Sequence, residues 1–144
     1  MRRAFLYLLL LSVSGLLHGG QKSVVLIARA DSKVSDLDSL TVRKLFMGWP
    51  VLVNGGPLHA IRNRSDEQLD EVFLQQVVAM SQSAYERQIL TGLNRQGSIR
   101  PEDVTSQERV LQELLTDPNA VSFAWLRDVA HNPKIRVIRV LWSE

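Results

Sequence analysis

The sequence predicts an α/β fold on the basis of three observations. Apolar, strand-like runs stand near both ends of the chain, at Ser23–Ala30, Ala120–Leu126 and Ile135–Leu141. Three or four segments between these runs carry apolar residues at helical spacing, and most of them follow a residue type that caps helices. The length of 144 residues is that of one ordinary domain with a single apolar core. Strands that enclose helices in this order favour one α/β domain.

The first residues have the pattern of a secretory signal. Met1–Arg3 is a short basic segment, and Ala4–Leu17 is almost wholly apolar. The apolar run is shorter than the ~20 residues that a membrane-spanning helix needs. We therefore predict a signal peptide over residues 1–20 and an exported, periplasmic domain over residues 21–144.

The cleavage site is poorly marked, because small residues occur at several places near the end of the apolar run. Cleavage is expected between Gly15 and Gln21, and an uncleaved N-terminal anchor is the alternative. The sequence contains no cysteine, which excludes both a lipid-anchored N-terminal cysteine and a disulfide framework. An exported domain of this kind depends on its core alone.

The charge balance says little about partners. Once Arg2 and Arg3 leave with the signal peptide, the Lys and Arg residues balance the Asp and Glu residues. A nucleic-acid binder needs a clustered basic face with interleaved aromatic residues, whereas here the arginines are scattered from Arg29 to Arg139. We expect no nucleic-acid partner. The preference for Arg over Lys suits oxyanions, and a compositional habit of the genome explains it at least equally well.

The first half of the domain reads as a strand, a helix and a turn between two extended pieces. Ser23–Ala30 is apolar and rich in β-branched residues, which predicts a buried strand. Thr41 can cap a helix that continues to Met47, and Gly48 can stop it. Asn54–Pro57 has the composition of a tight turn.

A short strand from Leu58 leads through two arginines into a second helix. Ser65 is the predicted N-cap of this helix, with Gln68 at the capping-box position. A stripe at helical spacing predicts the side that faces the core, and its members are Leu69, Val72, Phe73, Gln76, Val77 and Met80.

Two further capping-box patterns predict the remaining helices. The segments are, in order, a helix opened by Ser83 and Glu86 that ends at Gly92, a loop over residues 94–103, a helix opened by Thr105 and Glu108, and its closing turn at Asp117–Asn119. The last strand-like run follows, with Arg136 and Arg139 among its apolar residues.

The sequence lacks the common catalytic and metal-binding motifs. It has no G-x-S-x-G elbow, no P-loop and no G-x-G-x-x-G. Beyond His18 in the predicted signal peptide, the histidines are His59 and His131, which do not form a pair at helical spacing. The carboxylates between Asp66 and Glu71 fall on the polar face of one helix, where solvation is the usual role. We predict no enzyme activity, no cofactor and no metal site. An enzyme remains a third alternative only because of His59 and His131.

Many individually weak positions of the chain follow a familiar order. They are Leu40, Leu45, Phe46, Gly48, Trp49, Gly55, Phe73, Val77, Val78, Tyr85, Gly92, Pro101 and the run from Asp117 to Phe123. This order resembles the second-lobe segment of the type 2 periplasmic solute-binding proteins of the phosphate ABC-transporter family. The resemblance implies a single, three-layer-like lobe with a central mixed sheet flanked by three to five helices. It also implies a non-catalytic role related to transport.

Arg62, Asn63, Arg64 and Ser65 stand where the resemblance places the bound anion, and they are the candidate ligand-binding residues. In the full-length phosphate binders the second lobe supplies an Arg and then a Ser-Gly-Thr turn at a helix N-terminus, where backbone N–H groups face the anion. Here Arg62 and Ser65 are one residue too close, and no Gly-Thr follows. The two acidic residues after Ser65 already complement the helix dipole and oppose an arriving anion.

Two functions of different classes follow from these residues. The first is a binding module for phosphate or another small oxyanion, of low affinity. The second is an envelope interaction or sensory accessory domain that has lost ligand binding and whose partner is a membrane-bound transporter or sensor. In that case Ser65 is only a cap, and Arg62 and Arg64 pair with nearby carboxylates. Trp142 is the aromatic residue predicted to contact such a partner.

Overall fold

A mixed sheet of five strands forms the centre of the protein. The structure is a computed structural model that describes residues 22–144, so the predicted signal peptide and its cleavage site lie outside the described residues. The strands, in the spatial order β5-β4-β6-β1-β7, are β5 (Glu102–Val104), β4 (His59–Asn63), β6 (Ala120–Trp125), β1 (Ser23–Arg29) and β7 (Ile135–Ser143). β1 is antiparallel to β6 and β7, whereas β4 is parallel to β5 and β6.

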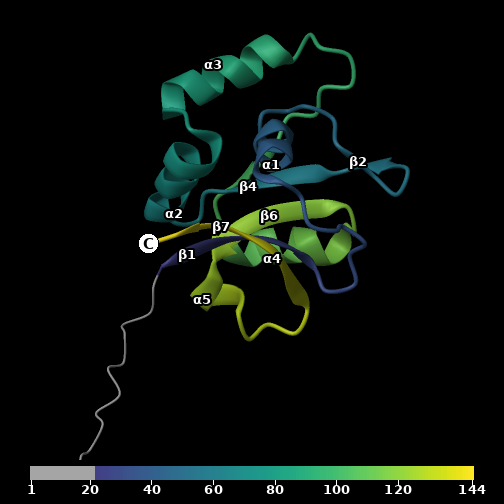
Figure 1. Cartoon of the computed structure of the whole chain (residues 1–144), viewed down its shortest axis with the longest axis vertical. Coiled ribbons are helices and arrows are strands. Elements are labelled where there is room, and N and C mark those ends of the chain that lie inside the picture. The colour runs from purple at the N-terminus through teal and green to yellow at the C-terminus, as the bar shows by residue number, and fades with distance from the viewer. Residues whose placement is uncertain (1–21) are drawn as a thin grey trace, which may run out of the picture.

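Helices cover both faces of the sheet and give three layers. They are α1 (Ser39–Phe46), α2 (Glu67–Val72), the π-helix η1 (Phe73–Val78), α3 (Gln82–Gly92), α4 (Gln107–Thr116) and α5 (Leu126–Val129). Figure 1 shows α1, α2 and α3 on one side of the sheet, with α4 and α5 toward the other. The predicted α/β lobe with a flanked mixed sheet is therefore confirmed. Among residues 22–144, no helix is both long and apolar enough to cross a membrane.

Two apolar cores lie on the two faces of the sheet, and β1 contributes to both. Val24, Leu26 and Ala28 belong to the core beneath α1, η1 and α3. Val25 and Ile27 belong to the core beneath α4 and α5. This alternation is the period-2 pattern of a strand that is buried on both sides.

The first core is built around three phenylalanine rings from three different elements. Phe46, Phe73 and Phe123 have ring centroids 4.8, 5.6 and 3.6 Å apart, in two edge-to-face contacts and one stacked contact. Such pairs add about 0.5–1.5 kcal/mol beyond the area that they bury. They fix α1 and η1 against β6, and therefore fix the helices that surround the carboxyl end of β4.

The strand predictions hold, apart from their ends. The tight turn predicted at Asn54–Pro57 joins β2 (Leu52–Val53) to β3 (Gly56–Pro57), with Asn54 at φ 50° and Gly55 at φ 83°. Two left-handed residues are what a two-residue hairpin turn needs. The predicted loop over residues 94–103 was wrong at its end, because β5 begins at Glu102, and neither β5 nor α5 was predicted.

The predicted helix caps were wrong by one to three residues. The observed N-caps are Asp38 for α1, Asp66 for α2, Ser81 for α3 and Ser106 for α4, in place of Thr41, Ser65, Ser83 and Thr105. In each case the side chain accepts a hydrogen bond from the backbone N–H three residues later, and the cap itself is extended. Each site offers several capping residues close together, and only the backbone conformation selects one of them.

The predicted core-facing stripe of the second helix holds except at Gln76, because Leu69 and Phe73 are buried and Val72, Val77 and Met80 are partly buried against the first core. From Phe73 the helix continues as η1, whose wider turn shifts the fully buried positions. Leu74 and Val78 are buried, whereas Gln76, a predicted member of the stripe, is exposed. η1 ends at Val78 and is followed by Ala79, which is left-handed at φ 60°.

Candidate functional site

The four predicted binding residues lie at the carboxyl end of β4, with Arg62 and Asn63 as its last residues and Arg64 and Ser65 in the turn that follows. β5, β4 and β6 run parallel, so their carboxyl ends lie at one edge, which is where open α/β sheets bind ligands. Strand alternation sends neighbouring side chains to opposite faces. Arg62 and Arg64 lie toward α2 and α3, whereas Asn63 lies toward α4. The four residues therefore form two separate networks.

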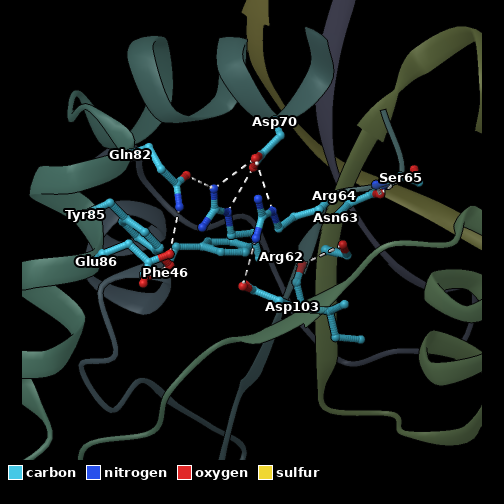
Figure 2. A network of polar contacts seen from close by, with 12 residues as sticks. Phe46, Arg62, Asn63, Arg64, Ser65, Asp70, Gln82, Tyr85, Glu86 and Asp103 are labelled. Carbon is cyan, nitrogen blue, oxygen red and sulfur yellow. Dashed lines mark hydrogen bonds and ion pairs between the residues drawn. The ribbon is translucent and has the colours of Figure 1, made fainter. Parts of the chain in front are cut away.

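The first network surrounds the guanidinium of Arg62, which is fully buried at 0% exposure. Its Nε and Nη2 atoms donate to the two carboxylate oxygens of Asp70, both at 2.9 Å, and Nη2 also donates to Gln82 at 2.6 Å. The guanidinium lies 4.8 Å from the centre of the Tyr85 ring. Figure 2 shows this arrangement. A bidentate carboxylate and an aromatic face are the two partners that a buried guanidinium binds best.

Asp70 also contacts Arg64, which directly follows β4. Arg64 lies 3.5 Å from Asp70 and 3.4 Å from Asp103, and 38% of its side chain is exposed. The side chain of Asp70 is only 13% exposed. One carboxylate from α2 therefore lies between both cations of the candidate site (Figure 2).

Tyr85 closes the buried side of this network. Its hydroxyl donates to the carbonyl of Phe46 at 2.6 Å, so the ring is held between α3 and α1. Burial raises the pKa of Tyr85, so this phenol stays protonated and cannot serve as a negative partner for Arg62.

The second network is centred on Asn63, which is also fully buried. Its Nδ2 donates to Gln107 and to the carbonyl of Phe123, both at 2.9 Å. Its Oδ1 accepts from the Ser65 hydroxyl at 2.6 Å and from the Ser65 backbone N–H at 3.1 Å. The amide of Asn63 is thus fully used by the protein, and Ser65 ties the turn after β4 to this amide instead of capping α2.

Asp66 occupies the N-terminus of α2. Its carboxylate accepts from the backbone N–H of Leu69 at 3.0 Å and from the indole N–H of Trp125 at 3.3 Å. The Leu69 hydrogen bond lowers the pKa of Asp66, against burial, which raises it, and Trp125 lowers it further. The helix N-terminus that an anion could use is therefore already taken by a carboxylate.

Several residues of these networks were not predicted as site residues. Asp70 was assigned to a solvated helix face, Gln82 was not singled out, and Tyr85 was noted only for the resemblance. A signal for Asp70 existed, because it stands one turn after Asp66 on the same helix and can face β4. No pattern in the sequence indicates Gln82, because it belongs to a different helix.

The remaining candidates for chemistry lie elsewhere. Among residues 22–144, no group of three or more His, Cys, Asp or Glu residues is placed to hold a metal ion. His59 stands at the amino end of β4 and pairs with Asp117, and His131 is exposed in the turn before β7. Trp125 is buried, Trp142 is half-buried against the first core, and Trp49 is the exposed tryptophan of the described range.

Comparison with known proteins identifies the fold through structure alone. No protein-family model matches the sequence. No curated protein matches it.

Among solved structures, the chain is similar to a protein assigned as a phosphate ABC transporter substrate-binding protein from Clostridium perfringens, solved with bound phosphate (TM-score 0.63, 10% identity, covering 83% of this chain and 45% of that one). It is likewise similar to an ABC-type phosphate transport receptor from Vibrio cholerae, with a TM-score of 0.62 and 10% identity over 83% of this chain and 46% of that one. A third similar structure is PstS from Borrelia burgdorferi, with a TM-score of 0.56 and 12% identity over 78% of this chain and 44% of that one.

The likeness defines the class of fold. The chain has the α/β fold of one lobe of a periplasmic solute-binding protein, as the resemblance implied. It spans less than half the length of the solved structures that it matches.

Proposed function

We propose that this chain is an exported, non-catalytic module of the solute-binding fold that acts as an interaction or sensory accessory domain in the envelope and has lost strong anion binding. A membrane-bound transporter or sensor is the class of partner. The solute-binding neighbours support the non-catalytic assignment. The basic and apolar N-terminal pattern supports export.

The observation that supports this proposal is that Arg62 is already paired with Asp70. Its bidentate bond to Asp70 supplies from within the protein what a bound anion would supply. An arriving phosphate must displace Asp70 from two arginines and then stand beside Asp66 and Glu67 at the helix N-terminus. The negative charges of these two carboxylates repel the phosphate. The pairing of Arg62 with Asp70 therefore supports a domain that keeps the solute-binding fold but has lost strong affinity for an anion.

An exposed apolar surface supports an interaction role. Trp49, Leu90 and Leu93 are exposed large apolar residues, and Leu90 and Leu93 flank Gly92 at the end of α3. The guanidinium of Arg95 lies over the Trp49 ring at 3.7 Å and packs against Gly92, which brings the ring close to this helix end. Aromatic residues and arginine are enriched where proteins meet.

A weak oxyanion site is the second candidate function, and two observations favour it. Arg64 keeps 38% of its side chain exposed. The Nη1 atom of Arg62 is buried without a hydrogen-bond partner, which leaves one donor of the network unused. In this case the ligand contacts are Arg62, Asn63, Arg64 and Ser65, as the resemblance implies.

Titration of phosphate and sulfate separates the two functions. We expect no saturable change in tryptophan fluorescence or in the thermal midpoint at millimolar anion, because Asp70 already contacts both arginines of the candidate site. A saturable shift with wild-type protein that disappears in Arg64→Ala and persists in Arg109→Ala, an exposed arginine on α4, would establish the weak oxyanion site instead.

Export is tested separately, by N-terminal sequencing of the protein recovered from the envelope fraction. A retained Met1 there contradicts cleavage between Gly15 and Gln21.

A further inference from the structure

The end of α3 and the segment after α1 meet on one side of the domain and expose large apolar side chains there. Trp49 is 41% exposed, Leu90 56% and Leu93 47%. The Ile99 N–H donates to the Gly48 carbonyl at 3.0 Å, which joins the two segments. Figure 1 shows the loop after α3 descending toward α1. Single exposed leucines are ordinary on a protein surface, whereas a cluster that includes a tryptophan indicates an interaction site.

Helical spacing and one arginine bring these side chains together. Leu90 and Leu93 are three residues apart, so they lie on the same side of the helix end, and Arg87 extends this exposed side by one turn. The guanidinium of Arg95 lies 3.7 Å from the centre of the Trp49 ring and packs on the end of α3. We refer to Trp49, Arg87, Leu90, Leu93 and Arg95 together as the Trp49 face.

The Trp49 face carries positive charge without carboxylates. No Asp or Glu occurs in residues 39–57 or in residues 87–101, the two segments that form it. Within residues 22–144, neither Arg87 nor Arg95 has an ion-pair partner, and the Nε and Nη2 atoms of Arg95 are buried without a hydrogen bond. In contrast, Arg109 on α4 and Arg139 on β7 both pair with carboxylates. The described part of the protein therefore leaves the charge of this face uncompensated.

An anionic lipid surface fits both properties of the Trp49 face. Tryptophan prefers the boundary between lipid headgroups and hydrocarbon, leucine enters the apolar layer, and each arginine near an anionic leaflet adds to the attraction. Trp49, Leu90 and Leu93 do not line the cavities of about 420 and 490 Å³ on the domain. A side chain that protrudes from a partner protein would meet none of these cavities here, whereas a bilayer needs no preformed pocket.

We propose that the Trp49 face docks on a membrane surface that contains anionic phospholipid. Trp49, Leu90 and Leu93 enter the headgroup boundary, and Arg87 and Arg95 face the lipid phosphates. The proposal rests on the proposed envelope function, in which the partner is membrane-bound, and it adds the lipid surface that brings the domain to that partner.

The charge is tested by sedimenting the protein recovered from the envelope fraction with vesicles of equal parts phosphatidylglycerol and phosphatidylcholine. We expect binding that weakens with added salt and in pure phosphatidylcholine. Arg87→Gln should weaken it about fivefold, the loss expected for one basic residue at an anionic surface. Arg109→Gln removes the same charge from an exposed position on α4 and should leave binding nearly unchanged.

The apolar contribution is tested with a second pair of variants. Leu90→Gln should weaken binding to the same vesicles about tenfold, because it removes apolar surface that the bilayer would bury. Leu115→Gln makes the same change at an exposed position of α4 and should bind as wild type does. Both leucines are exposed, so both variants should fold normally.

Trp49 provides a local measurement that an uncleaved N-terminal segment does not affect. Brominated phosphatidylglycerol in the vesicles should quench the part of the tryptophan fluorescence that Trp49→Phe removes. Absence of this quenching, or equal quenching in wild type, Arg87→Gln and Leu90→Gln, would overturn the proposal. Dimerisation lost in Leu90→Gln, without vesicle binding, would assign the face to a second copy and overturn it as well. The anion titration and the N-terminal sequencing are independent of these results, so failure of lipid docking is distinguishable from failure of the proposed function.

Discussion

At the carboxyl end of β4, the carboxylate of Asp70 serves two arginines. The Arg62 guanidinium is fully buried, and both of its hydrogen bonds to Asp70 measure 2.9 Å. Removing one member of a buried pair leaves the other charge without compensation, which costs far more than an exposed pair contributes. The Arg62–Asp70 pair therefore contributes to the stability of the fold and also forms part of the candidate site.

Asp70→Asn should destabilise the protein by about 3 kcal/mol, because the buried guanidinium of Arg62 loses its counter-charge. The measurement is the free energy of unfolding from urea denaturation. Glu71→Gln is the matched control, since it removes the same charge from the exposed neighbour on α2 and should stay within about 0.5 kcal/mol of wild type.

Sulfate gives the same variant a second measurement. If Asp70 occupies the place of an anion, sulfate should raise the thermal midpoint of Asp70→Asn more than that of Glu71→Gln. A loss of stability below 1 kcal/mol in Asp70→Asn would contradict the buried pair, using the range of about 3–5 kcal/mol for such losses.

Asp66 gives the stability a defined dependence on pH. Its pKa is lowered in the folded state from 3.8, chiefly by the Leu69 N–H. A lowered folded pKa stabilises the protein above the unfolded value, and this contribution is lost as the pH falls below 3.8 through the folded value. Asp66→Ala should therefore cost about 1 kcal/mol at neutral pH, and the difference from wild type should vanish in acid.

Ser65→Ala distinguishes the observed cap from the predicted one. Ser65 bonds Asn63 and does not cap α2, and a serine hydroxyl does not titrate, so the cost of removing it should be the same at neutral and acidic pH. Urea denaturation at neutral and acidic pH checks both variants. A cost of Asp66→Ala that stays the same from neutral to acidic pH would contradict Asp66 as the cap.

The sequence predicts that the four candidate residues follow a strand and that, in one alternative, Arg62 and Arg64 pair with nearby carboxylates, but it does not indicate which carboxylates they contact. The two arginines, the asparagine and the serine follow a strand, and the resemblance placed an anion there. Whether Arg62 faces solvent or Asp70 depends on how α2 packs on β4, eight residues away along the chain. The contribution of Gln82 depends on the turn after η1, which the sequence does not indicate.

At the scale of whole elements, the long and strongly apolar segments were predicted and the short or irregular ones were not. β6 is buried throughout and the five central residues of β1 are buried, and apolar runs of this kind have few alternatives. β5 has three residues and α5 four, which is too short for any periodicity to develop. The π-helix was missed because Leu69, Phe73 and Val77 also fit an ordinary helix.

Ala79→Gly tests the strain at the end of η1. Ala79 is left-handed at φ 60°, a conformation that costs an L residue about 1–2 kcal/mol and costs glycine little. The substitution should raise the free energy of unfolding by about 0.5–1 kcal/mol, after allowance for the extra freedom of glycine in the unfolded chain.

Ala84→Gly is the control for this effect. Ala84 is helical in α3, so the same substitution there should lower the free energy of unfolding by about 0.5–1 kcal/mol. Opposite signs at the two positions are expected in urea denaturation. Equal losses at both would show that Ala79 is not strained.

At the scale of the whole molecule, β1 joins the two cores into one cooperative unit. Its five central residues are fully buried, and they alternate between the core beneath α1 and the core beneath α4. Without cysteine, no covalent cross-link holds the chain together, so the cores carry the stability. A protein in which one strand serves both cores should not unfold one face at a time.

Ile27→Ala tests this coupling, because Ile27 faces only the core beneath α4 and α5. The truncation should cost about 2–5 kcal/mol through lost burial and the cavity that it leaves. If the cores are coupled, it must also lower the midpoint of the tryptophan fluorescence transition, because Trp125 and Trp142 both pack in the other core, and this transition must coincide with helix loss by circular dichroism. Val140→Thr, an exposed position on β7 that keeps its β-branched shape, should leave both midpoints nearly unchanged. Separate transitions for the two probes in Ile27→Ala would mean that the cores unfold independently, and that β1 separates them instead of joining them.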